Sequence, residues 1–141
     1  MLTVFRINLV LLVYSMQPID IDVGFKEGCA VGIKSVLDEN DRVIASFRCH
    51  GWTFLSGPGV KPVLCELTGR ANGNVHGKGG SMHMYGKNFY GGNGIVGAQQ
   101  SMGTGIAFAL KYRKQKNVCF TLFGDGAGNQ GQLFECIFCL V

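Results

Sequence analysis

The sequence has 141 residues, of which 47% are hydrophobic and 16% charged, with a net charge of +4. This balance excludes a disordered chain, because it supplies enough apolar side chains for a core. The basic residues are scattered except for one group, Lys111 to Lys116, which favours a solvated helix end over a nucleic-acid surface. We therefore expect one folded domain, or a piece of a larger one, that binds no nucleic acid.

The first apolar run, Leu9 to Tyr14, is too short to span a membrane. Arg6 ahead of it gives a faint likeness to a signal peptide, but no small-residue cleavage site follows before Pro18. This start is also not rich in arginine and serine, as a mitochondrial presequence would be. We expect no membrane span and no clear targeting segment.

Apolar spacing predicts a first helix over residues 26–37 and a second over residues 60–68. A short strand over residues 42–46 is expected between them, and it delivers Arg48 and His50 at its end. Arg48 could bind an anion or form a surface ion pair, and His50 could join it or be structural. The side chains expected to face the core are Cys29, Ile33, Val36 and Leu37 in the first helix and Leu64 and Leu67 in the second.

The region from Arg70 to Gly97 shows little helical or alternating pattern. Its aromatic and aliphatic residues exclude disorder, and long loops in compact domains are usually functional. Polar side chains and many bare backbone amides suit this loop to wrapping a phosphorylated ligand. Its two histidines, His76 and His83, lack the pattern of a zinc site.

A third helix is predicted over residues 98–112, and its expected buried stripe is Met102, Ile106, Ala109 and Leu110. Gly103 and Gly105 allow this helix to pack closely against a sheet or another subunit. A buried strand, Val118 to Phe123, and a further helix from Gln130 to Leu140 complete the pattern. Alternating strands and helices predict an α/β fold with a parallel sheet flanked by helices.

The turn Gly124-Asp125-Gly126 follows directly on that strand. A strand that ends in a tight turn and feeds a helix places the turn at the carboxyl edge of a parallel sheet, where α/β proteins bind ligands. Asp125 is a hard anion that could hold Mg²⁺ together with phosphate oxygens. Taken alone, an ordinary Asp-Gly turn explains the motif as well.

Six cysteines are present, but their spacing resembles no disulfide framework, and 141 residues can form a core without disulfides. Cys136 and Cys139 form a C-x-x-C with no second pair and no nearby histidine. We expect neither zinc binding nor a redox role for them.

Four runs together resemble the alpha subunit of the pyruvate dehydrogenase first component: Phe47–Gly51, Gly77–Tyr85, Lys87–Gln99 and Leu122–Gln132. The resemblance covers residues 24–135 without insertions. The loop is the specific part, because a branched-chain 2-oxo acid dehydrogenase subunit would share the turn around Asp125 but not this loop.

The resemblance implies a partial thiamine diphosphate-binding fold and an oxidoreductase that decarboxylates pyruvate with thiamine diphosphate and Mg²⁺. The acetyl unit passes to the lipoyl group of the acyltransferase component and gives acetyl-CoA. A heterotetramer with a beta subunit, in the mitochondrial matrix, is implied as well. The beta subunit would supply the activating carboxylate, so no catalytic residue is expected in this chain.

The resemblance also implies roles for individual residues. Asp125 would bind magnesium, and Gly126 and Ala127 the diphosphate. Phe47 and Arg48 would contact cofactor and substrate, with Phe47 standing where the family has a tyrosine. The remaining implied contacts are Gly94 and Val96 to the aminopyrimidine and Gly86 to pyruvate.

Residues 1–23 and 136–141 do not resemble the family, and Ile21 stands at the position of a family histidine. We therefore expect a chain truncated at both ends, with the asparagine that completes the magnesium site beyond Val141. The alternative to an enzyme subunit is a non-catalytic relic that keeps the fold but cannot hold cofactor. A nucleotide-binding protein is a weaker reading, because neither a P-loop nor G-x-G-x-x-G follows a strand.

Overall fold

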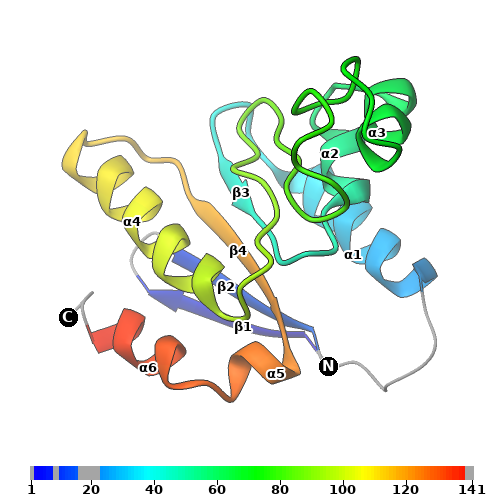
Figure 1. Ribbon diagram of the computed structural model, residues 1–141. Helices are drawn as coiled ribbons and strands as arrows, with labels where there is room; N and C mark the ends of the chain where they lie inside the picture. Colours follow the sequence, from blue (N-terminus) through cyan, green and yellow to red (C-terminus); the bar gives the residue numbers. More distant parts are fainter. Residues whose placement is uncertain (1, 8–9, 16–22, 139–141) are drawn as a thin grey trace.

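The computed structural model describes residues 2–7, 10–15 and 23–138, in which helices lie on both faces of a central sheet (Figure 1). Among these residues, no helix is long and apolar enough to cross a membrane. Ile21 and Cys139 lie outside the described residues. The elements are β1 (Leu2–Ile7), β2 (Val10–Ser15), α1 (Val23–Val36), β3 (Arg42–Ile44), α2 (His50–Leu55), α3 (Val60–Leu67), α4 (Ala98–Tyr112), β4 (Cys119–Gly124), α5 (Asp125–Gly128) and α6 (Gly131–Phe138).

The sheet has four strands in the order β1-β2-β4-β3. β4 pairs in parallel with both β2 and β3, and β1 joins β2 as an antiparallel edge strand. The predicted α/β fold with a parallel sheet flanked by helices is therefore confirmed. The sequence did not lead us to expect β1 and β2, although both are rich in the aliphatic, β-branched and aromatic residues that suit strands.

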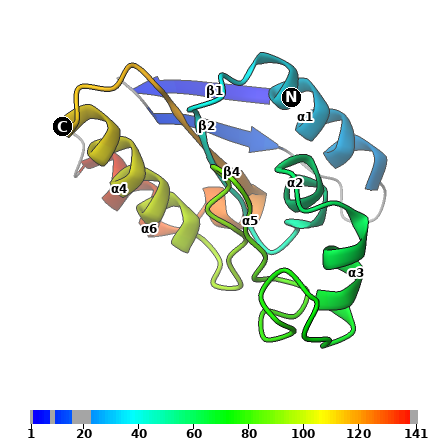
Figure 2. The same cartoon turned by 90° about the horizontal axis from the view of Figure 1, so that it is seen from above.

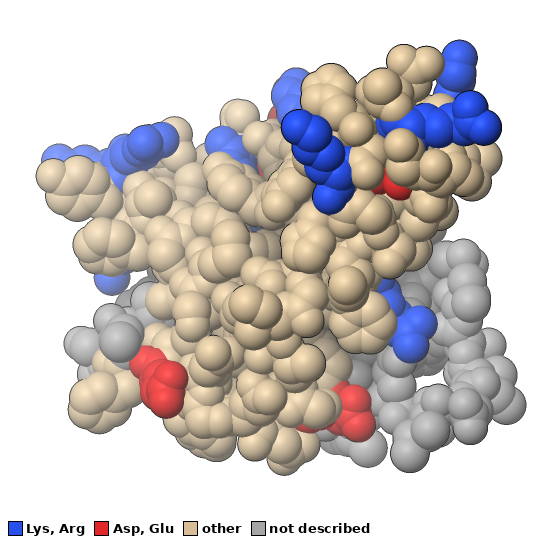
Figure 3. Space-filling view, viewed as in Figure 1, with Lys and Arg blue, Asp and Glu red and all other residues tan. Residues whose placement is uncertain are grey.

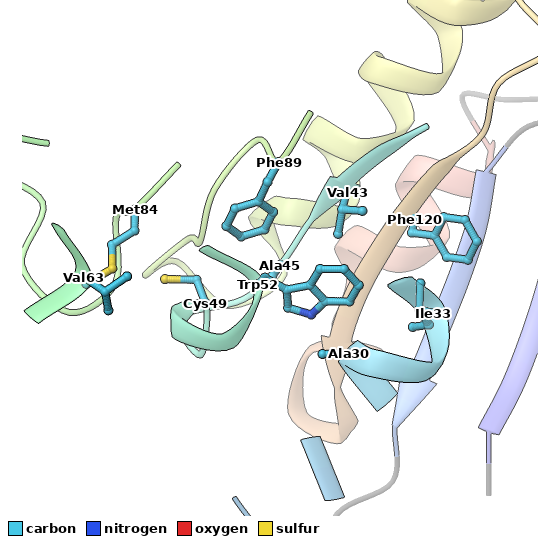
Figure 4. Close-up of a cluster of buried hydrophobic side chains, with 10 residues drawn as sticks. All are labelled: Ala30, Ile33, Val43, Ala45, Cys49, Trp52, Val63, Met84, Phe89 and Phe120. Carbon is cyan, nitrogen blue, oxygen red and sulfur yellow. The ribbon is translucent and has the colours of Figure 1, made fainter. Parts of the chain in front are cut away.

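Residues of β3 and β4 alternate between two hydrophobic clusters, as the two-residue period of a strand requires. Val43 and Phe120 point to one face, where α1 and α2 cover them, and Trp52 stacks on Phe89 at 6.4 Å between ring centroids (Figure 4). Ile44 of β3, with Cys119 and Phe123 of β4, faces α4 and α6, whereas Leu122 packs against the first cluster. The second cluster consists of Ile44, Ala107, Leu110, Cys119, Phe123 and Ala127.

Figure 2 views the molecule from above and separates these layers, with α1 and α2 on one side of the sheet and α4 and α6 on the other. α4 contacts both β3 and β4, and it also contacts α6. Both helical layers therefore rest on the same two parallel strands, whose ends carry the predicted site residues.

Several predicted helix faces were wrong. The exposed residues among those expected inside are Val36, Leu64, Leu67, Met102 and Ala109. Ala30 in α1, Glu66 in α3 and Gly103 in α4 take the buried positions instead. Small residues are buried there because they permit close approach between elements, and a polar residue is buried because it accepts hydrogen bonds from loop amides. Hydrophobic spacing in the sequence predicts neither kind of burial.

α2 was not predicted, and its sequence, His-Gly-Trp-Thr-Phe-Leu, contains mostly weak helix formers. Burial of Trp52 and Thr53 holds this helix in place, and the hydroxyl of Thr53 donates to the carbonyl of Cys49 at 2.9 Å. The predicted bounds of α4 are confirmed at both ends. The five described cysteines are free thiols.

Candidate functional site

Two parallel strands bring Arg48 and Asp125 to the same edge of the sheet. Ile44, the last residue of β3, pairs with Thr121 of β4. Each chain then runs on past this edge, to Arg48 after β3 and to Asp125 after β4. The carboxyl edge of parallel strands is the usual ligand-binding side of an α/β sheet.

Phe47 and Arg48 form one exposed unit at this edge. The Phe47 side chain is 44% exposed, and the guanidinium carbon of Arg48 lies 5.0 Å from the centre of its ring. An aromatic face attracts a cation without neutralising its charge, as an anionic partner would. Arg48 therefore presents a positive charge to solvent beside the end of β3.

Asp125 opens α5 directly after β4, and its side chain is exposed. Its carbonyl accepts a hydrogen bond from the side-chain amide of Asn129 at 2.9 Å, which fixes the turn. A Cβ placed on Gly124 or Gly126 would meet no atom within 4 Å, so the space around the turn is open. A ligand can therefore approach both the carboxylate and the adjoining backbone.

The start of α4 is tied to the same turn. The buried side chain of Gln100 donates to the carbonyl of Ala127 at 3.1 Å. A Cβ on Gly97 would lie only 2.5 Å from Oε1 of Gln132, so the N-terminal end of α4 closely approaches α6. Oε1 of both Gln100 and Gln132 is buried without a hydrogen-bond partner. Gly94 and Val96, both exposed, precede this junction in the chain.

The glycine-rich loop reaches this edge by running along β3. The amide of Tyr90 donates to the carbonyl of Val43 at 2.7 Å, and the amide of Ala45 donates to that of Gly91 at 3.0 Å. A Cβ on Gly92 would lie 2.8 Å from Sγ of Cys49. The loop thus passes beside the segment that carries Phe47 and Arg48 before it enters α4.

Gly86 packs against the end of α2. Its backbone pairs with Phe89 through two hydrogen bonds of 3.1 Å, and a Cβ on Gly86 would collide with the side chain of Ser56 at the end of α2. Phe89 in turn bridges to Val43 in β3, before the strand end that leads to Arg48. The contacts of Gly86 are therefore with α2 and its own loop.

The donor set at the edge fits a magnesium diphosphate. Among the described residues, no group of three or more His, Cys, Asp and Glu side chains could hold a metal. Mg²⁺ usually binds through one or two carboxylates plus phosphate oxygens and water, which the exposed Asp125 in its open turn can satisfy. Figure 3 shows acidic atoms over the part of the surface where α5 lies.

The sequence-based interpretation of the loop amides was wrong for four of them. The amides of Val75 and Gly77 donate to Oε2 of Glu66 at 2.7 and 3.0 Å. Those of Gly79 and Gly80 donate to its Oε1 at 2.7 and 3.2 Å. These amides bind an internal carboxylate rather than an external phosphate. A glycine-rich loop with many free backbone amides can indicate an acidic side chain nearby in the sequence that accepts their hydrogen bonds.

A sequence model of the dehydrogenase E1 component family matches residues 18–138. The pyruvate dehydrogenase E1 component subunit alpha type I, mitochondrial, of Ascaris suum is 73% identical over 110 residues. The probable mitochondrial alpha subunit of Caenorhabditis elegans is 71% identical, and the somatic mitochondrial form of Homo sapiens is 57% identical, over the same length. These matches cover 78% of this chain, which spans 28% of the length of each of these relatives.

Proposed function

Because the chain belongs to the dehydrogenase E1 component family, we propose that it forms part of the alpha subunit of a pyruvate dehydrogenase. The observation that carries this proposal is the placement of Arg48 and Asp125 beyond two paired parallel strands, at one sheet edge, in a chain 73% identical over 110 residues to a pyruvate dehydrogenase alpha subunit. The proposed substrate is pyruvate, and the proposed location is the mitochondrial matrix.

Thiamine diphosphate with Mg²⁺ is the proposed cofactor. Asp125 would bind the metal, and the amides of Gly126 and Ala127 would face the diphosphate. Gly94 and Val96 would line the aminopyrimidine. When bound, thiamine diphosphate would supply the ylid and the electron sink that decarboxylation of a 2-oxo acid requires.

Arg48 is proposed to bind an anionic group of the cofactor or the carboxylate of pyruvate. A guanidinium keeps its charge at all relevant pH values and presents several donors to an oxyanion. Stacking on Phe47 limits the positions that the guanidinium can take. Phe47 stands where the family has a tyrosine, and it lacks the hydroxyl that would donate a hydrogen bond. Its proposed role is therefore packing alone. Gly86 remains a proposed pyruvate contact.

The proposed partners are a beta subunit and the lipoyl-bearing acyltransferase component. A carboxylate of the beta subunit would activate the aminopyrimidine, and the lipoyl group would carry the acetyl unit to coenzyme A. The proposed assembly is a heterotetramer with the cofactor between alpha and beta subunits. The chain's own residues would therefore bind and orient rather than transfer protons.

The test is thiamine diphosphate binding by Asp125→Asn, measured by calorimetry with Mg²⁺ in the assembly with the beta subunit. We expect at least about tenfold weaker binding, because even ligands outside the first metal shell commonly contribute 10–100-fold in affinity. The control is Asp38→Asn, which removes an exposed carboxylate far along the chain from the turn. Equal affinity in Asp125→Asn and wild type would contradict the proposed magnesium role, and wild-type protein without cofactor binding would contradict the function.

A further inference from the structure

Glu66 in α3 is a fully buried carboxylate that has no part in the proposed cofactor contacts. Each of its two oxygens accepts two backbone N–H groups, from residues 75, 77, 79 and 80. Only an ionised carboxylate can accept four such bonds without presenting a donor of its own. Burial alone would raise the pKa of Glu66, but the four amides outweigh it and hold the pKa below its ordinary value.

The loop is shaped to close around this side chain. A Cβ on Gly73 would lie 2.7 Å from the Cα of Glu66, and one on Gly79 would lie 3.3 Å from its Oε1. Gly77 and Gly80 have φ values of 77° and 62°, which favour glycine. The glycines therefore let the amides converge on one carboxylate, and Glu66 supplies the negative charge on which they converge.

The loop then continues directly to the candidate site. The carbonyl of Ser81 lies 2.7 Å from Nε2 of His50, two residues after Arg48. The thiol of Cys49 donates to the carbonyl of Met82 at 3.6 Å. A Cβ on Gly94 would lie 3.4 Å from the sulfur of Met82 and 3.5 Å from a ring carbon of His83. The segment that follows the Glu66-bound amides thus touches the neighbours of Arg48 and packs beneath Gly94.

We propose that Glu66 is a positioning residue for the cofactor site: it fixes loop residues 75–80, and residues 81–83 transmit that placement to Arg48 and Gly94. Glu66 itself contacts neither cofactor nor substrate. This role rests on the proposed function, because it assigns Glu66 to the site that would hold thiamine diphosphate.

The experiment compares Glu66→Gln with wild type in the assembly with the beta subunit. An amide side chain offers one acceptor oxygen, and its NH₂ group faces two backbone donors, so about half of the bonds are lost. We expect the amides of residues 75, 77, 79 and 80 to exchange hydrogen at least about tenfold faster. The dissociation constant of thiamine diphosphate and the KM for pyruvate should rise, with a smaller change in kcat.

Two further variants complete the design. Glu39→Gln makes the same chemical change at an exposed glutamate and should leave exchange and binding unchanged. Glu66→Asp keeps the charge on a shorter stem, so it should restore part of the protection and part of the affinity. It also keeps the test decisive should Glu66→Gln not fold.

Unchanged exchange at these amides in the Glu66 variants would overturn the proposal. Faster exchange with wild-type affinity for thiamine diphosphate would also overturn it, since the loop would then be uncoupled from the site. Wild-type protein that binds no thiamine diphosphate would instead overturn the proposed function, and the assignment of Glu66 to that site with it. The wild-type sample alone distinguishes this last result from the other two.

Discussion

Gly103 of α4 lies directly against Thr121 of β4. A Cβ placed on Gly103 would lie 3.0 Å from the Cβ of Thr121 and 3.1 Å from its Cγ2, and its nearest neighbour would be the Thr121 hydroxyl oxygen. Thr121 is fully buried in the centre of the sheet. The helix therefore approaches the strand more closely than any side chain would allow. This contact sets the distance between α4, which begins beside the turn of Asp125, and the strand that ends in it.

We expect Gly103→Ala to destabilise the protein by about 1–3 kcal/mol, because the added methyl overpacks a filled contact between helix and strand. Gly105→Ala in the same helix is the matched control, since its Cβ would meet no atom within 4 Å. Helix propensity predicts a gain of up to about 1 kcal/mol for that variant. Urea unfolding followed by circular dichroism measures both. Equal effects of the two substitutions would contradict the close contact.

Asp41 joins the starts of β3 and β4, and we expect Asp41→Ala to cost about 1–3 kcal/mol through unsatisfied buried groups. Its Oδ1 accepts the amide of Val118 at 2.9 Å, and its Oδ2 accepts the amide of Asp38 at 3.0 Å. Asp38→Ala removes an exposed carboxylate three residues away and should change stability little. Chemical unfolding of the two variants provides the comparison, and a cost shared by both would argue against the bridging role.

The stabilisation from Glu66 should depend on pH. Its folded-state pKa is lowered from the ordinary value of 4.5, so its contribution is present above about pH 4.5 and is lost as the pH falls through the folded-state pKa. The difference in unfolding free energy between wild type and Glu66→Gln should therefore be constant near neutral pH and shrink in acid. Urea titrations across this range measure it. A difference that stays constant into acid would show that the carboxylate charge is not involved.

Cys119 should resist thiol reagents in the native protein. It is fully buried in the second hydrophobic cluster, and burial, opposed by the Thr121 hydroxyl, raises the pKa of its thiol to about 12. Only the thiolate reacts, so alkylation at about pH 8 should be negligible there. Cys29, partly exposed on α1, is the internal comparison and should be labelled. Mass spectrometry of the alkylated peptides measures the extent of labelling at both cysteines. In denaturant, Cys119 and Cys29 should be equally reactive. Native labelling of Cys119 at the rate of Cys29 would contradict this burial.

The fold could be predicted from sequence where one segment carries its own signal. The helix of residues 98–112 keeps both of its predicted ends, although Met102 and Ala109 of its predicted buried stripe are exposed. The β4 strand is a continuous apolar run that stops at glycine, and its predicted bounds differ by one residue at each end. α2 carried no such signal, because its helix is fixed by Trp52 and Thr53 packing into a core made by other segments.

Of the candidate site, the sequence placed Asp125 after a buried strand, and the structure has it there, exposed in an open turn. For Phe47, Arg48, Gly94 and Val96, the sequence shows only the local motifs to which they belong. Their spatial relation depends on strand order and on the loop that runs beside β3. The roles of these residues stay predictions.

By itself, the sequence determined the family of this protein and the helix and strand that precede Asp125, because these depend on residues near one another in the chain. Only the tertiary structure decided what the loop amides bind and which helix faces are buried. Glu66 satisfies amides nine to fourteen residues away, and Gly103 meets a threonine in another element. Such contacts are selected by shape and by the need to satisfy buried polar groups, which hydrophobic periodicity does not encode.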